Sequence, residues 1–309
     1  MLHPRKATAW LALLALVCLT VPQTAAAQAP EAVVKAPTKL YPKPAVYLLL
    51  RLPGDTVTVR YTPGSLDRAA NLQNRLELAN RAFKRWVGVK LEIDVYLLSR
   101  DEWRQARYDV PYGVPVRVDR RGLAAPAEGD DGTVALWSEM LQGALPAVAG
   151  APIRGTPQQT ATMILADFIT QLQICEILVD EIEIAGDRQW VRGLTTHLAS
   201  VDLVRRLEAG RLRDLDTMYQ LLARDAGPRA FSARDYGPEL SLHDWLWYQA
   251  QFHAGAQVLL AKIGKGAVKK MRQLRKKSGG VLSGDLLLRR YKGLDQWYYD
   301  HFTAVSLRH

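Results

Sequence analysis

The sequence predicts an α+β fold, with a mixed α/β half at residues 45–150 and a helical half at residues 151–304 of one domain. Alternating apolar and polar residues, typical of half-buried strands, occur in the first half. Through the second half, apolar residues recur every three or four positions, as in amphipathic helices. The 309 residues are 48% apolar and 23% charged, which excludes a disordered tail, a collagen-like repeat and a polytopic membrane protein.

The N-terminus has the order of a secretory signal peptide. Met1–Lys6 is short and basic, Ala7–Val21 is apolar, and small residues follow at positions 24–29. We expect cleavage after Ala27 and therefore an exported protein, soluble and periplasmic or extracellular. An uncleaved membrane anchor is the alternative, although the apolar run is short for a membrane span.

Removal of residues 1–27 leaves a Pro/Ala-rich stretch at 28–44, which predicts an extended linker before the domain. Cys175 is then the one cysteine of the mature chain, so no internal disulfide can form. Because Cys175 lies in an apolar stretch, we expect a buried side chain that serves packing. Residues 305–309 form a short tail.

The first half combines strand patterns with two helix starts. Pro53-Gly54-Asp55 separates two alternating runs and predicts a β-hairpin. Ser65 can cap a helix, and Ser99 with Glu102 forms a capping box that opens a short one. The segment 110–132 is rich in Pro and Gly. The expected strands are 46–51, 56–61, 91–95 and 133–137, and the helix after Ser65 has the apolar stripe Leu72, Leu76, Ala79 and Phe83.

The second half is a series of helices. Thr156-Pro157-Gln158-Gln159 combines an N-cap, a first-turn proline and a capping-box glutamine, so a helix begins at Pro157. Residues 180–183, three of them acidic, could coordinate Ca²⁺, but no EF-hand-like spacing surrounds them and we interpret them as a solvated connecting turn. Residues 224–228 and 234–238 are interpreted as two further turns. The expected helices are 157–178, 190–209, 212–223, 242–263, 266–277, 283–290 and 294–304.

Two of these helices carry sequence phrases with a known counterpart. Ile164–Gln173 reads ILADFITQLQ, and Gln189–Leu198 reads QWVRGLTTHL. Together they resemble the catalytic helices of the gluzincin, or peptidase MA-like, metallopeptidases. In that family the first helix carries H-E-x-x-H in a phrase such as I-L-x-H-E-F-x-H-Q-L, and the second carries W-[FL]-x-E-G-[LF]-A-x-Y. The resemblance covers residues 45–304 and implies a thermolysin-like catalytic domain.

The zinc ligands of that family are missing from this chain. Two histidines four apart bind Zn²⁺, a glutamate beside the first activates water, and a glutamate of the next helix is the third ligand. The resemblance puts Ala166 and Thr170 at the histidines, Asp167 at the general base and Arg192 at the third ligand. Alanine cannot bind a metal and arginine repels one. We therefore expect no zinc and no catalytic residue.

The resemblance also suggests how the former metal pocket is filled and used. An ion pair between Asp167 and Arg192 would keep the two helices in register. The retained cleft would lie between the helices at 157–178 and 190–209 and the segment 110–132. Its candidate binding residues are Asp167, Thr170, Arg192 and His197.

Three functions follow from this interpretation. The first is a catalytically inactive metallopeptidase-like protein that binds an extended polypeptide or acts as a scaffold. The second is an active peptidase or hydrolase with a non-standard or misaligned site, although no H-E-x-x-H occurs in the chain. The chain also contains no G-x-S-x-G motif, no P-loop and no Rossmann fingerprint, so the sequence gives no sign of serine hydrolase or nucleotide chemistry. The third is a structural envelope protein attached through its basic C-terminal helices.

The formal charge of +10 is concentrated near the C-terminus. Twelve Lys and Arg from Lys262 onward face three acids, which gives +9 for this segment. Within it, the stretch 265–277 suggests a surface for an anionic membrane or envelope polymer, with a simple solvated helix face as the alternative. The expected export argues against nucleic acid, and no basic motif interleaved with aromatic residues is present, so we expect no nucleic acid partner. The cations of this candidate surface are Lys265, Lys269, Lys270, Arg272, Arg275, Lys276 and Lys277.

Overall fold

A computed structural model describes residues 39–45, 48–141, 143, 156–225, 232–237 and 240–302. The described residues belong to one compact unit of the chain. The expected signal peptide, most of the expected linker, the proline-containing ends of the two expected turns and the tail lie outside them.

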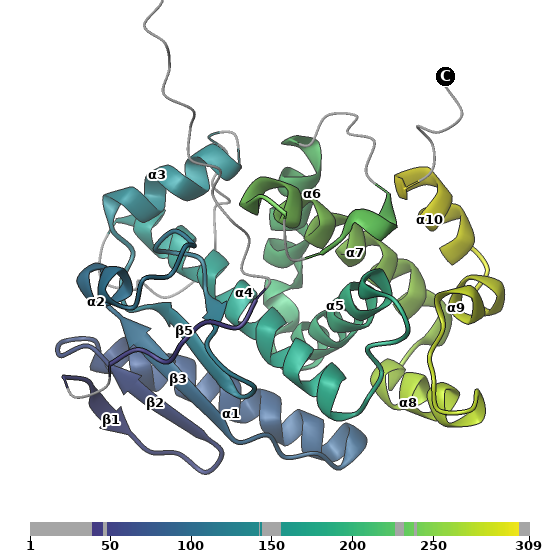
Figure 1. The fold of residues 1–309 in the computed structure, drawn as a ribbon, viewed down its shortest axis with the longest axis horizontal. Helices are drawn as coiled ribbons and strands as arrows, with labels where there is room; N and C mark the ends of the chain where they lie inside the picture. The colour runs from purple at the N-terminus through teal and green to yellow at the C-terminus, as the bar shows by residue number, and fades with distance from the viewer. Residues whose placement is uncertain are drawn as a thin grey trace, which may run out of the picture. The chain divides into compact units, whose positions relative to one another are not determined.

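A five-stranded mixed sheet forms in the first half of the chain (Figure 1). Three of its strands overlap predicted ones, whereas the other two lie in the segment 110–132, for which no strand was predicted. Its order is β1-β2-β3-β5-β4, in which β2, β3 and β5 are parallel and each edge strand is antiparallel to its neighbour. The α+β prediction is confirmed. The strands are β1 Leu50–Leu52, β2 Val57–Tyr61, β3 Ile93–Leu98, β4 Val116–Arg117 and β5 Gly122–Pro126.

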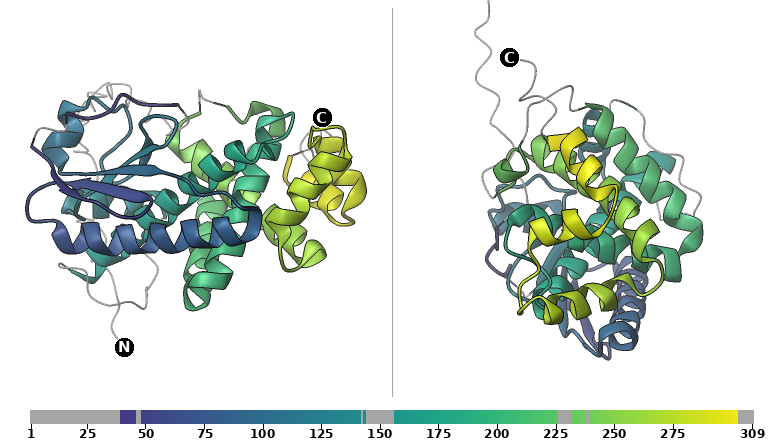
Figure 2. Two further views of the ribbon diagram at one scale, coloured as in Figure 1. Left: turned by 90° about the horizontal axis from the view of Figure 1, so that it is seen from below. Right: turned by 90° about the vertical axis from the view of Figure 1, so that its right-hand side faces the viewer.

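Helix α1 (Leu66–Val87) connects the parallel strands β2 and β3 and covers one face of the sheet (Figure 2). Its predicted apolar stripe is buried in the same cluster as the inward residues of β2 and β3. Ser65 occupies the N-cap position, but its side chain caps no backbone N–H of the helix. The capping box of Ser99 and Glu102 is present at the start of α2 (Arg100–Gln105).

Residues 133–137, predicted as a strand, are helical in the structure. They belong to α3 (Asp131–Met140), which is N-capped by Asp130 through a hydrogen bond from the Thr133 backbone N–H. Burial alone would raise the pKa of Asp130, but hydrogen bonds from Arg100 and Thr133 outweigh it and lower the pKa to about 2. The error arose because the short apolar run Val134–Trp137 fits either element, and the cap just before it decides for the helix.

The second half is helical, as predicted, with two 3₁₀ turns, η1 (Ala209–Arg211) and η2 (Ala233–Asp235). The capping box at Thr156 opens the first helix, which continues through Asp180 beyond its predicted end. The helices are α4 Pro157–Glu181, α5 Gln189–Leu207, α6 Leu212–Asp225, α7 Leu242–Ile263, α8 Ala267–Lys277, α9 Gly284–Arg290 and α10 Leu294–Phe302.

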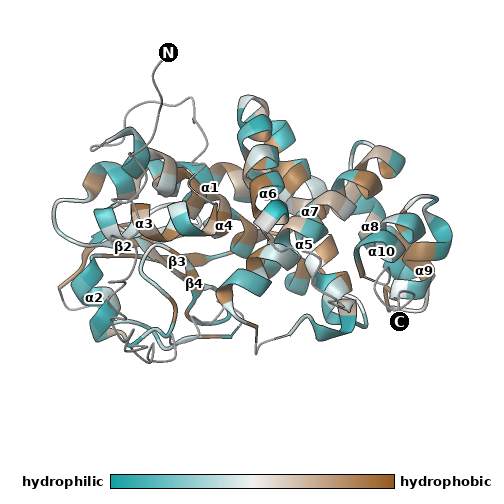
Figure 3. Cartoon of the chain, turned by 90° about the horizontal axis from the view of Figure 1, so that it is seen from above, coloured by the Kyte–Doolittle hydropathy of each residue, from teal (hydrophilic) through white to brown (hydrophobic). Residues whose placement is uncertain are grey.

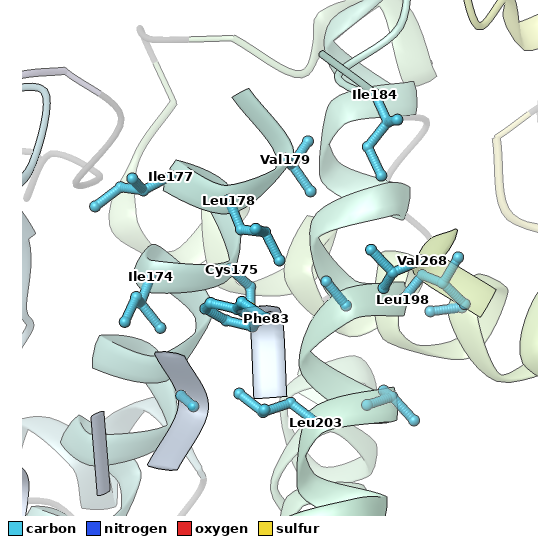
Figure 4. Close-up of a cluster of buried hydrophobic side chains, with 14 of the residues drawn as sticks. Phe83, Ile174, Cys175, Ile177, Leu178, Val179, Ile184, Leu198, Leu203 and Val268 are labelled. Atoms are coloured by element: carbon cyan, nitrogen blue, oxygen red, sulfur yellow. The ribbon is translucent and has the colours of Figure 1, made fainter. Parts of the chain in front are cut away.

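Helix α4 is the core of the fold. It is the one helix of the described chain that is long and apolar enough to cross a membrane, and 94% of its most apolar window is buried inside the protein. Figure 3 shows its brown, hydrophobic residues, whereas α2 is mostly teal. Cys175 of α4 packs near Phe83 of α1 (Figure 4), and this burial raises the pKa of its thiol.

Candidate functional site

A cavity of about 430 Å³ lies between α4, α5 and the segment around β4. These elements are the ones that the sequence analysis placed around a cleft. Tyr236 and Gly237 on one segment, with Trp245 and Gln249 of α7, close the remaining side. The side chains that line it are Lys39, Leu40, Arg117, Arg120, Leu172, Gln173, Glu176, Asp180, Gln189, Arg192, Thr196, Tyr236, Trp245 and Gln249.

Four charged residues meet in this cavity. Glu176 and Asp180 are four residues apart on α4 and so share one face of the helix. Arg192 of α5 contacts both, with Nε 3.1 Å from Glu176 Oε1 and Nη2 2.5 Å from Asp180 Oδ2. Arg117 of β4 reaches the same carboxylates at 3.3 Å from Asp180 and 3.9 Å from Glu176. Two guanidinium groups therefore neutralise two carboxylates and join the sheet to both helices.

Buried amide and hydroxyl groups form the rest of the polar lining. Gln173 donates to the carbonyl of Pro115 at 2.5 Å, and its Oε1 has no hydrogen-bond partner among the described residues. Thr196 Oγ1 is likewise buried and unpartnered within the described part of the chain. Gln249 bridges the Tyr236 hydroxyl and His197. The cavity thus combines charge pairs with neutral groups that have spare hydrogen-bonding capacity.

The chain's own residues 39–44 lie against the outer edge of β4 (Figure 1, dark purple). The Tyr41 backbone N–H donates to the Arg117 carbonyl at 2.8 Å, and the buried Tyr41 hydroxyl donates to Asp109. Lys43 pairs with Asp119 at 2.8 Å. These six residues, the end of the stretch predicted as an extended linker, are therefore docked on the domain, because the tyrosine and the lysine have partners there.

The ion pair predicted between Asp167 and Arg192 does not form. Asp167 instead accepts hydrogen bonds from both terminal nitrogens of Arg68, on α1, and lies 3.4 Å from Arg75. It lines a second cavity of about 920 Å³ between α1, α4 and the loop after β5, whereas Arg192 lines the first. Successive residues of a helix point about 100° apart. Asp167 therefore faces α1, whereas Glu176 and Asp180 of the same helix face the first cavity.

The other residues predicted for the cleft are buried beside it. Ala166 and Thr170 are fully buried, and the Thr170 hydroxyl donates to the Ala166 carbonyl at 2.9 Å. His197 is fully buried, and its Nε2 lies 2.9 Å from Gln249 Oε1. Burial, together with the nearby His253, lowers the pKa of His197 to about 3, so the ring is neutral at ordinary pH. Of the four predicted residues, Arg192 alone lines this cavity.

Glu176, Asp180 and Arg117 line the site but were not predicted from the sequence. The interpretation of residues 180–183 as a solvated turn is wrong at Asp180, which belongs to α4 and lines the cavity. One signal was available: two carboxylates four apart share one face of a largely apolar helix, so that face could be expected to meet cationic partners. The partner on β4 was not foreseeable, since it lies 63 residues from Asp180 in sequence.

The seven cations predicted as an anionic-surface site divide into two groups. Lys270 donates to the Ile263 carbonyl, Arg272 to the Val87 carbonyl, and Arg275 pairs with Glu183. These three hold α8 in place. The remaining four are exposed and form no ion pair with any described residue: Lys265, Lys269, Lys276 and Lys277.

Comparison with family models and with curated protein sequences finds no match. Within the described residues, no group of three or more His, Cys, Asp or Glu side chains is arranged to hold a metal ion.

Proposed function

We propose that this protein is an exported, gluzincin-like protein without catalytic zinc, which binds an extended polypeptide in the cavity between α4, α5 and β4. The observation that carries the proposal is the position of the cavity. It lies between an edge strand of the sheet and the first turn of α5, beside Arg192. In active members of the family a cleft so placed accepts an extended peptide.

The docking of residues 39–44 supports a polypeptide as the ligand. An edge strand presents unpaired backbone groups that can pair with an added chain. Here the Arg117 carbonyl of β4 already accepts a hydrogen bond from the Tyr41 backbone N–H. Leu40 and Lys39 continue from this contact into the cavity lining. A bound polypeptide would follow the same route beside these residues or in their place.

Arg192 explains why such a site would be catalytically inactive. A guanidinium held by Glu176 and Asp180 occupies the position where the resemblance puts the third zinc ligand. The positive charge disfavours a divalent cation, and without the metal no water is activated. None of the residues in the segment 164–173, which resembles the family's zinc-binding helix, pairs with Arg192. Glu176 and Asp180, which lie six and ten residues after Thr170, face Arg192 instead.

The first test combines metal content, hydrolysis and binding of fluorescently labelled casein as an extended polypeptide. We expect casein binding, no bound zinc and no metal-dependent cleavage. Gln189→Trp, at the exposed mouth of the cavity, should weaken binding about tenfold, the equivalent of about 1.4 kcal/mol. The control is Arg188→Trp at the neighbouring exposed position, which is absent from the cavity lining. Stoichiometric zinc with chelator-sensitive cleavage would establish an active peptidase instead.

The second test rebuilds a metal site in the cavity. Glu176→His, Asp180→His and Arg192→Glu together place two histidines four apart on α4 opposite a carboxylate of α5, the arrangement that binds Zn²⁺. We expect this variant to retain about one zinc per chain after dialysis, measured by elemental analysis, with circular dichroism confirming the fold. The matched variant Ala166→His, Thr170→His and Arg192→Glu should retain none. Zinc in the second variant but not the first would refute the assignment of the site to Glu176 and Asp180.

A further inference from the structure

Two segments far apart in the sequence carry cations without any acid. Residues 81–90 contain Arg81, Lys84, Arg85 and Lys90, and residues 262–282 contain eight Lys and Arg, with no Asp or Glu in either segment. The first segment is the C-terminal part of α1 and the residues that follow it. The second contains α8 and the loop after it. Only the second segment stands out as basic in the sequence. The four cations of the first segment are balanced by acidic residues elsewhere in the first half of the chain, so its net charge is not conspicuous.

The structure brings these two segments together. Arg272 of α8 donates to the Val87 carbonyl at the end of α1 at 2.6 Å, and Figures 1 and 2 show the end of α1 beside α8. A cation at a helix C-terminus is favoured by the helix dipole, so this contact is stable despite the surrounding charge. Lys269 and Lys276 lie three residues before and four residues after Arg272, on the same stripe of α8. Lys84 and Arg85 are exposed in the last turn of α1.

The exposed cations of this region form no ion pair with a described residue, although Arg81 interacts favourably with the charge of Glu77 on the same helix. These exposed cations are Arg81, Lys84, Arg85, Lys90, Lys265, Lys269, Lys276 and Lys277. The loop after α8 adds Val281, a valine with 52% of its surface exposed, four residues after Lys277. Clustered cations beside an exposed apolar side chain fit a bilayer, which offers both anionic head groups and an apolar interior.

We propose that the end of α1 and α8 together form a docking surface for an anionic phospholipid bilayer. The surface differs from the α8 segment predicted from sequence, because three of the seven α8 cations hold the fold and α1 supplies the replacements. Soluble polyanions would be attracted by the same charges, but they offer nothing to Val281. The surface is independent of the cavity between α4 and α5.

The experiment is sedimentation of the full chain with vesicles of phosphatidylcholine containing about 30 mol % phosphatidylglycerol, compared with phosphatidylcholine alone, at low and at about 0.5 M salt. We expect binding to the anionic vesicles that is lost at high salt. The variant Lys84→Gln with Arg85→Gln, on α1, should bind about 25-fold more weakly, as should Lys269→Gln with Lys276→Gln, on α8. The control Arg51→Gln with Arg213→Gln removes two exposed cations outside both segments and should bind like the unmodified protein.

Each other outcome overturns the proposal. Absence of binding to anionic vesicles at low salt removes the surface altogether. Normal binding by the α1 variant removes α1 from it and leaves only the α8 segment. Equal or tighter binding to a soluble polyanion, a single-stranded oligonucleotide of matched charge, would show that the bilayer is not the favoured partner. Loss of binding in the control variant would show that only net charge matters.

Discussion

Replacing Asp167 by alanine should lower the free energy of unfolding by about 3–5 kcal/mol, the cost of leaving a buried charge without its partner. Asp167 and Arg68 are each more than nine-tenths buried, and they form a bidentate ion pair, with two hydrogen bonds, between α4 and α1. Arg75 also loses a neighbour 3.4 Å away. Urea unfolding followed by circular dichroism measures the loss.

Two further variants show whether the missing partner is the cause. Arg68→Met with Asp167→Leu removes both charges and should recover most of the lost stability, because apolar groups of similar size can replace a buried ion pair at little cost. Asp101→Ala removes one side of the exposed pair with Arg104 and should change stability by less than about 0.5 kcal/mol. A double variant as unstable as Asp167→Ala would mean that packing at this site, and not the unpaired charge, dominates.

Gly193→Ala should destabilise the protein by about 2 kcal/mol through crowding between α5 and α7. A β-carbon at Gly193 would lie 2.5 Å from Cδ2 of Phe252. The Phe252 ring is fully buried and packed against Tyr236, Tyr248 and other rings, so it has no space to move. The gain in helix propensity from glycine to alanine, about 1 kcal/mol, offsets only part of this cost. Thermal or urea unfolding measures the difference.

The matched control for this substitution is Gly210→Ala. Gly210 lies in the exposed 3₁₀ turn after α5, and a β-carbon there meets no atom within 4 Å. Alanine at such a position restricts the unfolded chain and should be neutral or stabilise by up to about 1 kcal/mol. If Gly193→Ala were as well tolerated as Gly210→Ala, α5 and α7 would not be in the close contact described here.

Local signals explain which parts of the fold were predictable. The capping boxes at Ser99 and Thr156 involve residues three apart, so the sequence shows them directly, and both are present. Strand alternation located β2 within one residue and the start of β3 within two, but ended β3 three residues early. The expectation failed at residues 133–137, where a short apolar run fits either element. The place of Tyr41 against β4 was not foreseeable, because it depends on partners 68 and 76 residues away.

The candidate site was predictable only in outline. The sequence indicated which two helices and which loop segment would surround a cavity, and it singled out Arg192. It could not assign the partner of any charge. Asp167 and Arg192 were paired because their positions matched a family pattern, whereas Asp167 pairs with α1 and Arg192 with the next turns of α4.

The sequence by itself determined the mixed and helical halves, the order of the helices in the second half and the uneven distribution of charge. The tertiary structure decided that Asp180 faces a cavity, that Asp167 turns away from it, and that two acid-free segments form one basic surface. The physical reason is range. Caps and periodicity depend on residues three or four apart, whereas the partner of a charge depends on packing between segments separated by as many as 185 residues.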